Sequence, residues 1–398
     1  MKKIILIIVV MPMLCVIPVE SQQFIADFSV AKETVLRSIP AEYINKARNE
    51  LLVAYQHTSH GTHVSRGVFG LPDFKIGDEQ LFGISNSDEN GKLHFMDYAL
   101  ASYAPSGVDG SDLSRDETAF IQTTRNFLDA PENASVNVVM WSWCNIAGHN
   151  VSDNYLPGMT TLISEYGQVG SKIGTGDGQR ELPVAFIFMT GHANVNANTG
   201  DSNPKNQAAL IKDYCNSKGQ FCLDYYSIDT HDMDDTYFED SGDDGNSASY
   251  GGNFYTSWQN SHALGEDYFE NKETPGGSVA FGAHNSQHIT ANRKAYAFWW
   301  IIARIAGWEG HVVSAESRRD HEISLYPNPA RGLVFLNTGG LKTDMIEVFN
   351  LSGQKIKEFL SGGEASEISL DLTGMPDGCY LLKVHSEQGI LYRKLILQ

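Results

Sequence analysis

Four unbroken apolar or aromatic runs stand out in the middle of the chain. A strand with one face in water alternates apolar and polar residues, whereas a continuous run is typical of a parallel strand that helices cover on both faces. We therefore expect parallel strands at residues 51–57, 136–143, 182–190 and 221–228.

Helical patterns lie between and after these runs, at residues 115–130, 155–170, 203–219 and 290–308. The third is well delimited, with Pro204 near its start and Gly219 just after its end. Strands that alternate with helices predict a three-layer α/β/α, flavodoxin-like domain with a parallel sheet. We place this domain at residues 22–312.

The pattern changes after a polar linker at residues 313–322. Residues 323–398 contain short segments in which apolar and polar residues alternate, such as 345–350 and 380–385. Turn signals such as Asp377-Gly378 separate these segments. We expect a small all-β sandwich here.

The amino-acid composition limits the classes of partner that the protein is expected to bind. The 398 residues include 48 acidic and 29 basic ones, which gives a formal net charge of -19. Such a surface repels nucleic acid and anionic lipid, so we expect neither as a partner.

The N-terminus is typical of an export signal. Lys2 and Lys3 precede an apolar run at 4–19, and cleavage before Gln22 predicts a signal peptide at residues 1–21. The run is short for a membrane span and contains two prolines, and no other stretch is long and apolar enough, so we expect no membrane span. A lipoprotein alternative rests on Cys15, although Leu14 precedes it where a small residue would be expected.

The C-terminal segment closely resembles the C-terminal sorting domain of the type IX secretion system of Bacteroidetes. The matching motifs, in order, are "YPNPA" (326–330), "VFNLSGQKI" (348–356), "MPDGCYLLKV" (375–384) and "RKLIL" (393–397). The resemblance implies recognition by the type IX machinery and passage through the periplasm and the outer membrane. The mature protein would be secreted or anchored at the cell surface, and both outcomes stay open.

Polar residues with catalytic potential follow each predicted strand of the α/β domain. Ligands bind beyond the carboxyl ends of the strands in such sheets. In chain order the residues are Ser59; Asn145, Gly148 and His149; Gly191, His192 and Asn194; Asp229, His231 and Asp232; and, before the last helix, His284 and His288.

This order of serine, glycine with asparagine, and late histidine resembles the SGNH (GDSL-like) hydrolase superfamily. The domain also looks like a group of exported Bacteroidetes proteins with an SGNH-like core and a closing helix of the type "AFWWIIARIAGW" (297–308). The resemblance implies that Ser59 is a nucleophile and that His284 or His288 is its base. It also implies oxyanion binding by Asn194, with Gly191 and Asn145. A serine hydroxyl needs a base to become nucleophilic, and the tetrahedral anion needs preplaced donors.

The sequence departs from the family at its acidic positions. The family's Gly-Asp-Ser is His57-Thr58-Ser59 here, and Gly-x-Asn-Asp becomes the segment 191–194, "GHAN", with the asparagine displaced by one position. Before His288 an amide, Asn285, stands where the family has an aspartate. Asp229 or Asp232 is a candidate replacement from another loop.

Three functions follow from these patterns. The first is an exported serine hydrolase, an esterase or deacetylase acting on an extracellular glycan or another ester. The second is a catalytically inactive, SGNH-shaped surface protein that binds a glycan. The third is a metal-dependent hydrolase that uses the histidine-rich loops.

The metal hypothesis starts from His57, His60 and His63, which recur every three residues. Additional ligands available in the other loops are His192, His231, His284 and Asp232. Zinc in a catalytic site takes three protein ligands and a water. At a strand-to-loop transition, however, the three-residue spacing does not put all three histidines on one face.

A second cation site is predicted in the acidic run 232–253. Asp240, Asp243 and Asp244 partly match a calcium loop, but Gly242 occupies a ligand position and no glutamate closes the loop. Such a calcium ion would be structural, and we expect no cofactor to be required. Cys215 and Cys222 are either a disulfide, which export permits, or two small buried residues.

Overall fold

The computed structural model describes residues 24–272, 287–310, 324–338, 342–350, 354–363, 367–386 and 389–398. Contacts divide the chain into two compact units, Met1–Val312 and Val313–Gln398. The predicted signal peptide and linker, at 1–21 and 313–322, lie outside the described residues.

The first unit is built on a seven-stranded sheet in which every pairing is parallel. Its strands, in spatial order, are β1 (Ile25–Ala26), β7 (Cys222–Leu223), β6 (Ala185–Met189), β5 (Val138–Trp141), β2 (Leu52–Gln56), β4 (Leu93–Asp97) and β3 (Ile84–Ser85). From β2 the chain first continues to the β4 side and then returns to β5 on the other side. The β2–β5 boundary is therefore the switch point at which such sheets place their ligand sites.

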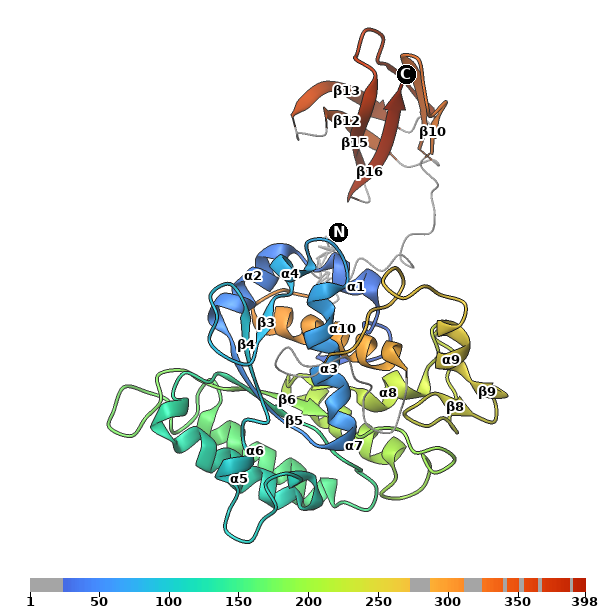
Figure 1. Cartoon of the computed structure of the whole chain (residues 1–398). Helices are drawn as coiled ribbons and strands as arrows, with labels where there is room; N and C mark the ends of the chain where they lie inside the picture. The colour runs from blue at the N-terminus through green and yellow to red at the C-terminus, as the bar shows by residue number, and fades with distance from the viewer. Residues whose placement is uncertain are drawn as a thin grey trace, which may run out of the picture. The chain divides into compact units, whose positions relative to one another are not determined.

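Helices cover both faces of this sheet (Figure 1), so the predicted three-layer α/β architecture is confirmed. One face carries α1 (Glu33–Ser38), α2 (Ala41–Glu50), α3 (Thr62–Gly70), α4 (Asp78–Leu81) and α10 (His288–Ile305). The other carries α5 (Glu117–Asp129), α6 (Leu156–Tyr166) and α7 (Pro204–Lys218).

Alternate residues of each strand enter two different cores. In β5, Val138 and Met140 pack with the α10 side, whereas Val139 and Trp141 pack with the α5 and α6 side. Both sets are buried, which is why the strands are continuously apolar rather than alternating. Helix α10 lies deepest: every residue from His288 to Arg304 is buried.

The predicted strand at 221–228 is only partly correct. Strand β7 ends at Leu223, and α8 (Tyr225–Thr230) follows it directly. The side chain of Asp224 accepts a hydrogen bond from the backbone N–H of Ser227 and caps this helix. The loops after α8 contain β8 (Asn246–Ser247), β9 (Gly252–Asn253) and α9 (Phe254–Gln259).

The second unit consists of two antiparallel sheets around one apolar core, as the alternating pattern predicts. One sheet has the order β10 (Ser324–Tyr326), β11 (Leu333–Asn337) and β14 (Glu367–Asp371). The other has the order β13 (Lys355–Gly363), β12 (Thr343–Asn350), β15 (Gly378–Ser386) and β16 (Gly389–Leu397).

Candidate functional site

Ser59 lies in a tight turn between β2 and α3. The turn is a single 3₁₀ segment, Ser59–Gly61, and Ser59 has a φ of 43°, in the left-handed region. A non-glycine residue there is uncommon and costs conformational energy, and such residues cluster at functional sites. A strand, a sharp turn and a helix also form the setting in which many hydrolases present a nucleophilic serine.

Two glycines allow the loops at this edge to pack closely. A Cβ atom on Gly61 would lie 1.9 Å from Oγ of Ser142, at the end of β5. A Cβ atom on Gly191, after β6, would lie 2.3 Å from Cγ2 of Ile146. The loops after β2, β5 and β6 are therefore in direct contact, and Gly191 is required there for packing.

The predicted oxyanion residues Asn145 and Asn194 lie together beside this turn. Nδ2 of Asn194 donates to Oδ1 of Asn145 over 3.2 Å, and Oδ1 of Asn145 also accepts from the backbone N–H of Ala147. The hydroxyl of Ser59 forms a hydrogen bond with the thiol of Cys144, the neighbour of Asn145. The structure thus gathers the serine and both asparagines at the β2–β5 switch point.

Two of the three spaced histidines have structural contacts. Nε2 of His57 lies 2.9 Å from Oδ1 of Asp97, and the hydroxyl of Ser65 donates to the other oxygen of that carboxylate. Nδ1 of His63 lies 2.7 Å from the hydroxyl of Tyr225. Both histidines are buried, so the repeat His57, His60 and His63 does not form one ligand set.

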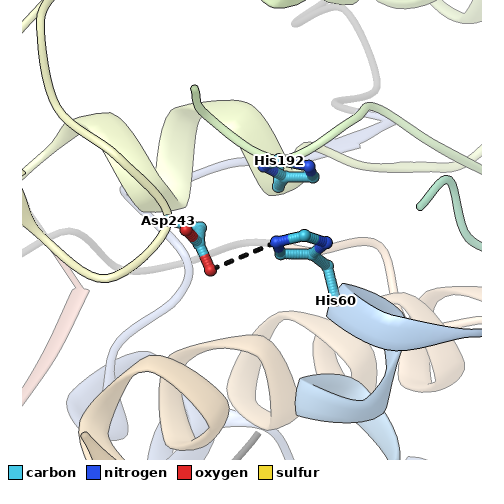
Figure 2. Close-up of side chains that lie close together, drawn as sticks. All are labelled: His60, His192 and Asp243. Carbon is cyan, nitrogen blue, oxygen red and sulfur yellow. Dashed lines mark ion pairs between the residues drawn. The ribbon is translucent and has the colours of Figure 1, made fainter. Parts of the chain in front are cut away.

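The remaining one, His60, meets residues from two other loops (Figure 2). Its ring stacks on that of His192, with centroids 3.5 Å apart and planes 13° apart. Nε2 of His60 lies 3.5 Å from Oδ2 of Asp243. One ligand atom from each of His60, His192 and Asp243 lies within 4.8 Å of the other two. Among the described residues this is the one such group of three or more His, Cys, Asp or Glu side chains.

Backbone contacts fix the His192 and Asp243 loops against each other. The carbonyl oxygen of Ala193 lies 2.9 Å from Nδ1 of His192 and accepts a bond from the backbone N–H of Asp243. In the neutral ring this contact assigns the proton of His192 to Nδ1 and the lone pair to Nε2. A histidine held in this way is ready to act as a base or as a metal ligand.

Buried charges surround the cluster. Burial, and secondarily the charge of Asp229, raises the pKa of Asp243 to about 8. Burial also raises the pKa of Asp229 to about 6, although Lys294 opposes the shift from 2.6 Å. Burial lowers the pKa of Lys294. The carboxyl groups of Asp229 and Asp243 therefore interact with the ammonium group of Lys294 in a region of low dielectric, and the buried guanidinium group of Arg293 also acts on Asp229.

Of the two predicted bases, the structure describes only His288. His284 lies outside the described residues. Nδ1 of His288 accepts from the backbone N–H of Asn271. The choice between His284 and His288 as the base stays a prediction.

The three calcium candidates point to different partners. Asp240 accepts bonds from Ser247 and from the backbone and hydroxyl of Ser249, and Asp244 accepts from the backbone N–H of Asn246. Asp243 instead faces His60. A calcium ion in this loop stays a prediction that the geometry does not favour.

A cavity of about 630 Å³ lies nearby, between the loop after β5 and the start of α7. It is lined by residues 148–152 and by parts of 201–210, and it does not include His60, His192 or Asp243.

Sequence patterns pointed to His60, His192 and Asp243 one at a time, but not to their convergence. The acidic neighbours of Asp243 predict a calcium loop, whereas in the structure its carboxyl group faces His60. The buried Asp229–Lys294 pair was not predicted either. The signal for it is a lysine in an otherwise apolar helix, since a buried ammonium group needs a carboxylate.

Residues 324–398 match the family described as "Secretion system C-terminal sorting domain". The chain therefore carries a type IX sorting domain. This domain directs the protein to the cell surface or the extracellular space, as the sequence motifs predicted. In the part of the chain that the structure describes, no helix is long and apolar enough to cross a membrane.

The remaining comparisons leave the α/β unit unassigned. No curated protein matches the chain. CopC from Methylosinus trichosporium OB3b is 25% identical over 18% of this chain and 79% of its own, with a TM-score of 0.15. An endo-beta-1,4-mannanase double mutant from Cellulomonas fimi is 11% identical over 90% of this chain and 80% of its own, with a TM-score of 0.20. Likenesses this low carry no argument about activity, and the SGNH resemblance of residues 22–312 stays a prediction.

Proposed function

We propose that the α/β unit is an exported hydrolase that cleaves ester bonds, with Ser59 as its nucleophile. One observation carries the proposal. Ser59 has a left-handed backbone at a strand-to-helix turn, beside the hydrogen-bonded pair Asn145 and Asn194. The SGNH resemblance implies the same roles for these residues, a nucleophile and oxyanion donors, although Asn194 is displaced by one position from the family's asparagine.

In this mechanism Ser59 attacks the carbonyl carbon of an ester, and its proton passes to a histidine base. The negative charge then develops on the carbonyl oxygen. An amide N–H₂ group donates to such an oxygen, and the Nδ2 groups of Asn145 and Asn194 are the donors that the site offers. Collapse of this tetrahedral intermediate breaks the bond to the alcohol, which leaves with the proton from the histidine, and an acyl-enzyme remains. The same histidine then takes a proton from water, which attacks the acyl-enzyme, releases the acid and restores the free serine.

The SGNH resemblance gives the role of the base to His284 or His288, which precede or begin α10. Comparison of His284→Ala with His288→Ala tests which of the two takes the proton of Ser59.

Hydrolysis of short acyl esters of p-nitrophenol by the mature full-length protein tests the proposal. Ser59→Ala is expected to reduce kcat by about a thousandfold or more, because no other group replaces the nucleophile. The matched control is Ser111→Ala, which removes an exposed loop hydroxyl that bonds only Asp109 among the described residues. It is expected to keep full activity.

Activity that survives in Ser59→Ala would contradict the serine mechanism. If the folded wild-type protein hydrolyses no ester in the panel, the inactive glycan-binding alternative gains support. A glycan array then becomes the decisive experiment for that alternative.

A further inference from the structure

We propose that His60, His192 and Asp243 bind one divalent transition-metal ion of the zinc class. Two imidazole nitrogens and one carboxylate oxygen are a ligand set that zinc takes in catalytic sites, with the fourth position left to water. Nothing in the proposed ester hydrolysis requires this site.

The geometry supports a shared ion. The three ligand atoms come from loops after β2 and β6 and before β8, yet all lie within 4.8 Å of one another. Zinc bonds to nitrogen and oxygen are about 2.0–2.2 Å long, so two ligand atoms of a tetrahedral zinc ion lie about 3.3–3.6 Å apart. The rings of His60 and His192 stack nearly parallel, so one ring must turn and the three side chains must draw together when they bind one ion.

The surroundings orient the ligands as metal sites usually do. Nδ1 of His192 contacts the carbonyl oxygen of Ala193, so Nε2 is the nitrogen that carries the lone pair in the neutral ring. The backbone N–H of Asp243 donates to the same carbonyl oxygen, so both ligands are tied to one peptide group. His60 and His192 are buried, with 9% and 6% of their surfaces exposed.

The site also contains buried carboxyl groups. Asp243 interacts electrostatically with Asp229, and the buried cations of Lys294 and Arg293 act on Asp229. A divalent ion at Asp243 would add positive charge beside these two carboxyl groups.

The ligand types select the metal class. Calcium and magnesium take oxygen ligands, six or more for calcium, and two imidazoles do not suit them. Imidazole suits zinc and the neighbouring first-row divalent ions. Zinc is therefore the probe, with calcium as the comparison ion.

The experiment uses the mature full-length protein, stripped with a chelator and dialysed against zinc. Elemental analysis is expected to find one zinc per chain, and zinc is expected to raise the melting temperature while calcium at the same concentration does not. His192→Gln and Asp243→Asn are expected to reduce zinc affinity by at least a hundredfold. The matched control Asp244→Asn removes the adjacent carboxylate, which faces Asn246, and is expected to keep the zinc.

Cobalt(II) substitution gives a second measurement if a variant folds poorly. The wild-type protein is expected to show the intense visible absorption of a four-coordinate cobalt site, and zinc is expected to abolish it. Absence of bound zinc in the wild type, or equal binding by folded His192→Gln, would overturn the proposal. Ser59→Ala is expected to bind zinc normally. Loss of zinc binding would therefore contradict the metal site alone, and absence of ester hydrolysis would contradict the serine mechanism alone.

Discussion

Nζ of Lys294 lies 2.6 Å from Oδ1 of Asp229, and neither side chain is exposed to solvent. Lys294 belongs to the central helix α10, and Asp229 to α8. The other carboxylate oxygen of Asp229 accepts from the backbone N–H of Ala193, next to His192. This one ion pair therefore connects the core helix to the loop that carries a candidate ligand.

Removal of the ammonium group should destabilise the protein strongly. In Lys294→Met the carboxylate of Asp229 stays buried without its cation, so we expect a loss of about 3–5 kcal/mol in the free energy of unfolding, measured with urea. Lys46→Met is the control, because Lys46 pairs with Glu50 on the surface over 4.0 Å. We expect less than about 1 kcal/mol there. Equal effects of the two substitutions would contradict the structural role of the buried pair.

His231 should make stability depend on pH. Its ring stacks on Phe28 with centroids 3.6 Å apart, and burial lowers its pKa below the ordinary 6.5. The unfolded chain therefore binds the proton more readily than the folded chain. The stability that the neutral ring contributes is present above pH 6.5 and decreases as the pH falls from there toward the folded pKa.

The variant His231→Phe keeps an aromatic ring on Phe28 but does not titrate. Urea unfolding of both proteins between about pH 7.5 and pH 5.5 brackets the ordinary histidine pKa. The stability of the wild type relative to the variant is expected to decrease toward low pH. A constant difference would show that His231 titrates equally in the folded and unfolded states.

We expect the side chain of Asn194 to stabilise the transition state of ester hydrolysis. If its Nδ2 group donates to the oxyanion, Asn194→Ala reduces kcat by about 10²–10³ with little change in KM. Asn206→Ala, which removes an exposed amide on α7, is the control and should leave kcat unchanged. A rise in KM at constant kcat would instead assign Asn194 to ground-state substrate binding.

The sorting domain should be needed for passage through the outer membrane. Deletion of residues 324–398 is expected to leave the α/β unit in the periplasm of a host with a type IX system, as cell fractionation would show. The full-length chain is expected at the surface or in the medium. Surface delivery of the truncated chain would contradict a sorting role for this unit.

Most of the fold follows from hydrophobic patterning. The runs at 51–57, 136–143 and 182–190 contain β2, β5 and β6, because strands that are buried on both faces are mostly apolar, with Gln56 at the end of β2 as a buried polar exception. The run at 221–228 was misassigned in part, since an apolar run does not distinguish a strand from a short buried helix. Asp224, which caps α8, is the local signal for the boundary.

The candidate site was harder to predict. The rule that loops at strand ends meet at one edge predicts that Ser59, Asn145 and Asn194 lie near one another, and Asn194 does bond to Asn145. It could not pair His60 with Asp243, because the loop before β8 has no periodic pattern that fixes its path over the sheet. Residue spacing alone therefore suggested a histidine repeat, whereas the structure makes a ligand group from three separate loops.

Covalent labelling of the mature protein with a fluorophosphonate probe, followed by peptide mapping, tests the central claim most directly. We predict stoichiometric modification at Ser59 and none in Ser59→Ala, with labelling unchanged in Ser111→Ala. Such a probe reacts only with an activated nucleophile. Failure of the folded wild-type protein to react, or labelling at another residue, would contradict a nucleophilic role for Ser59.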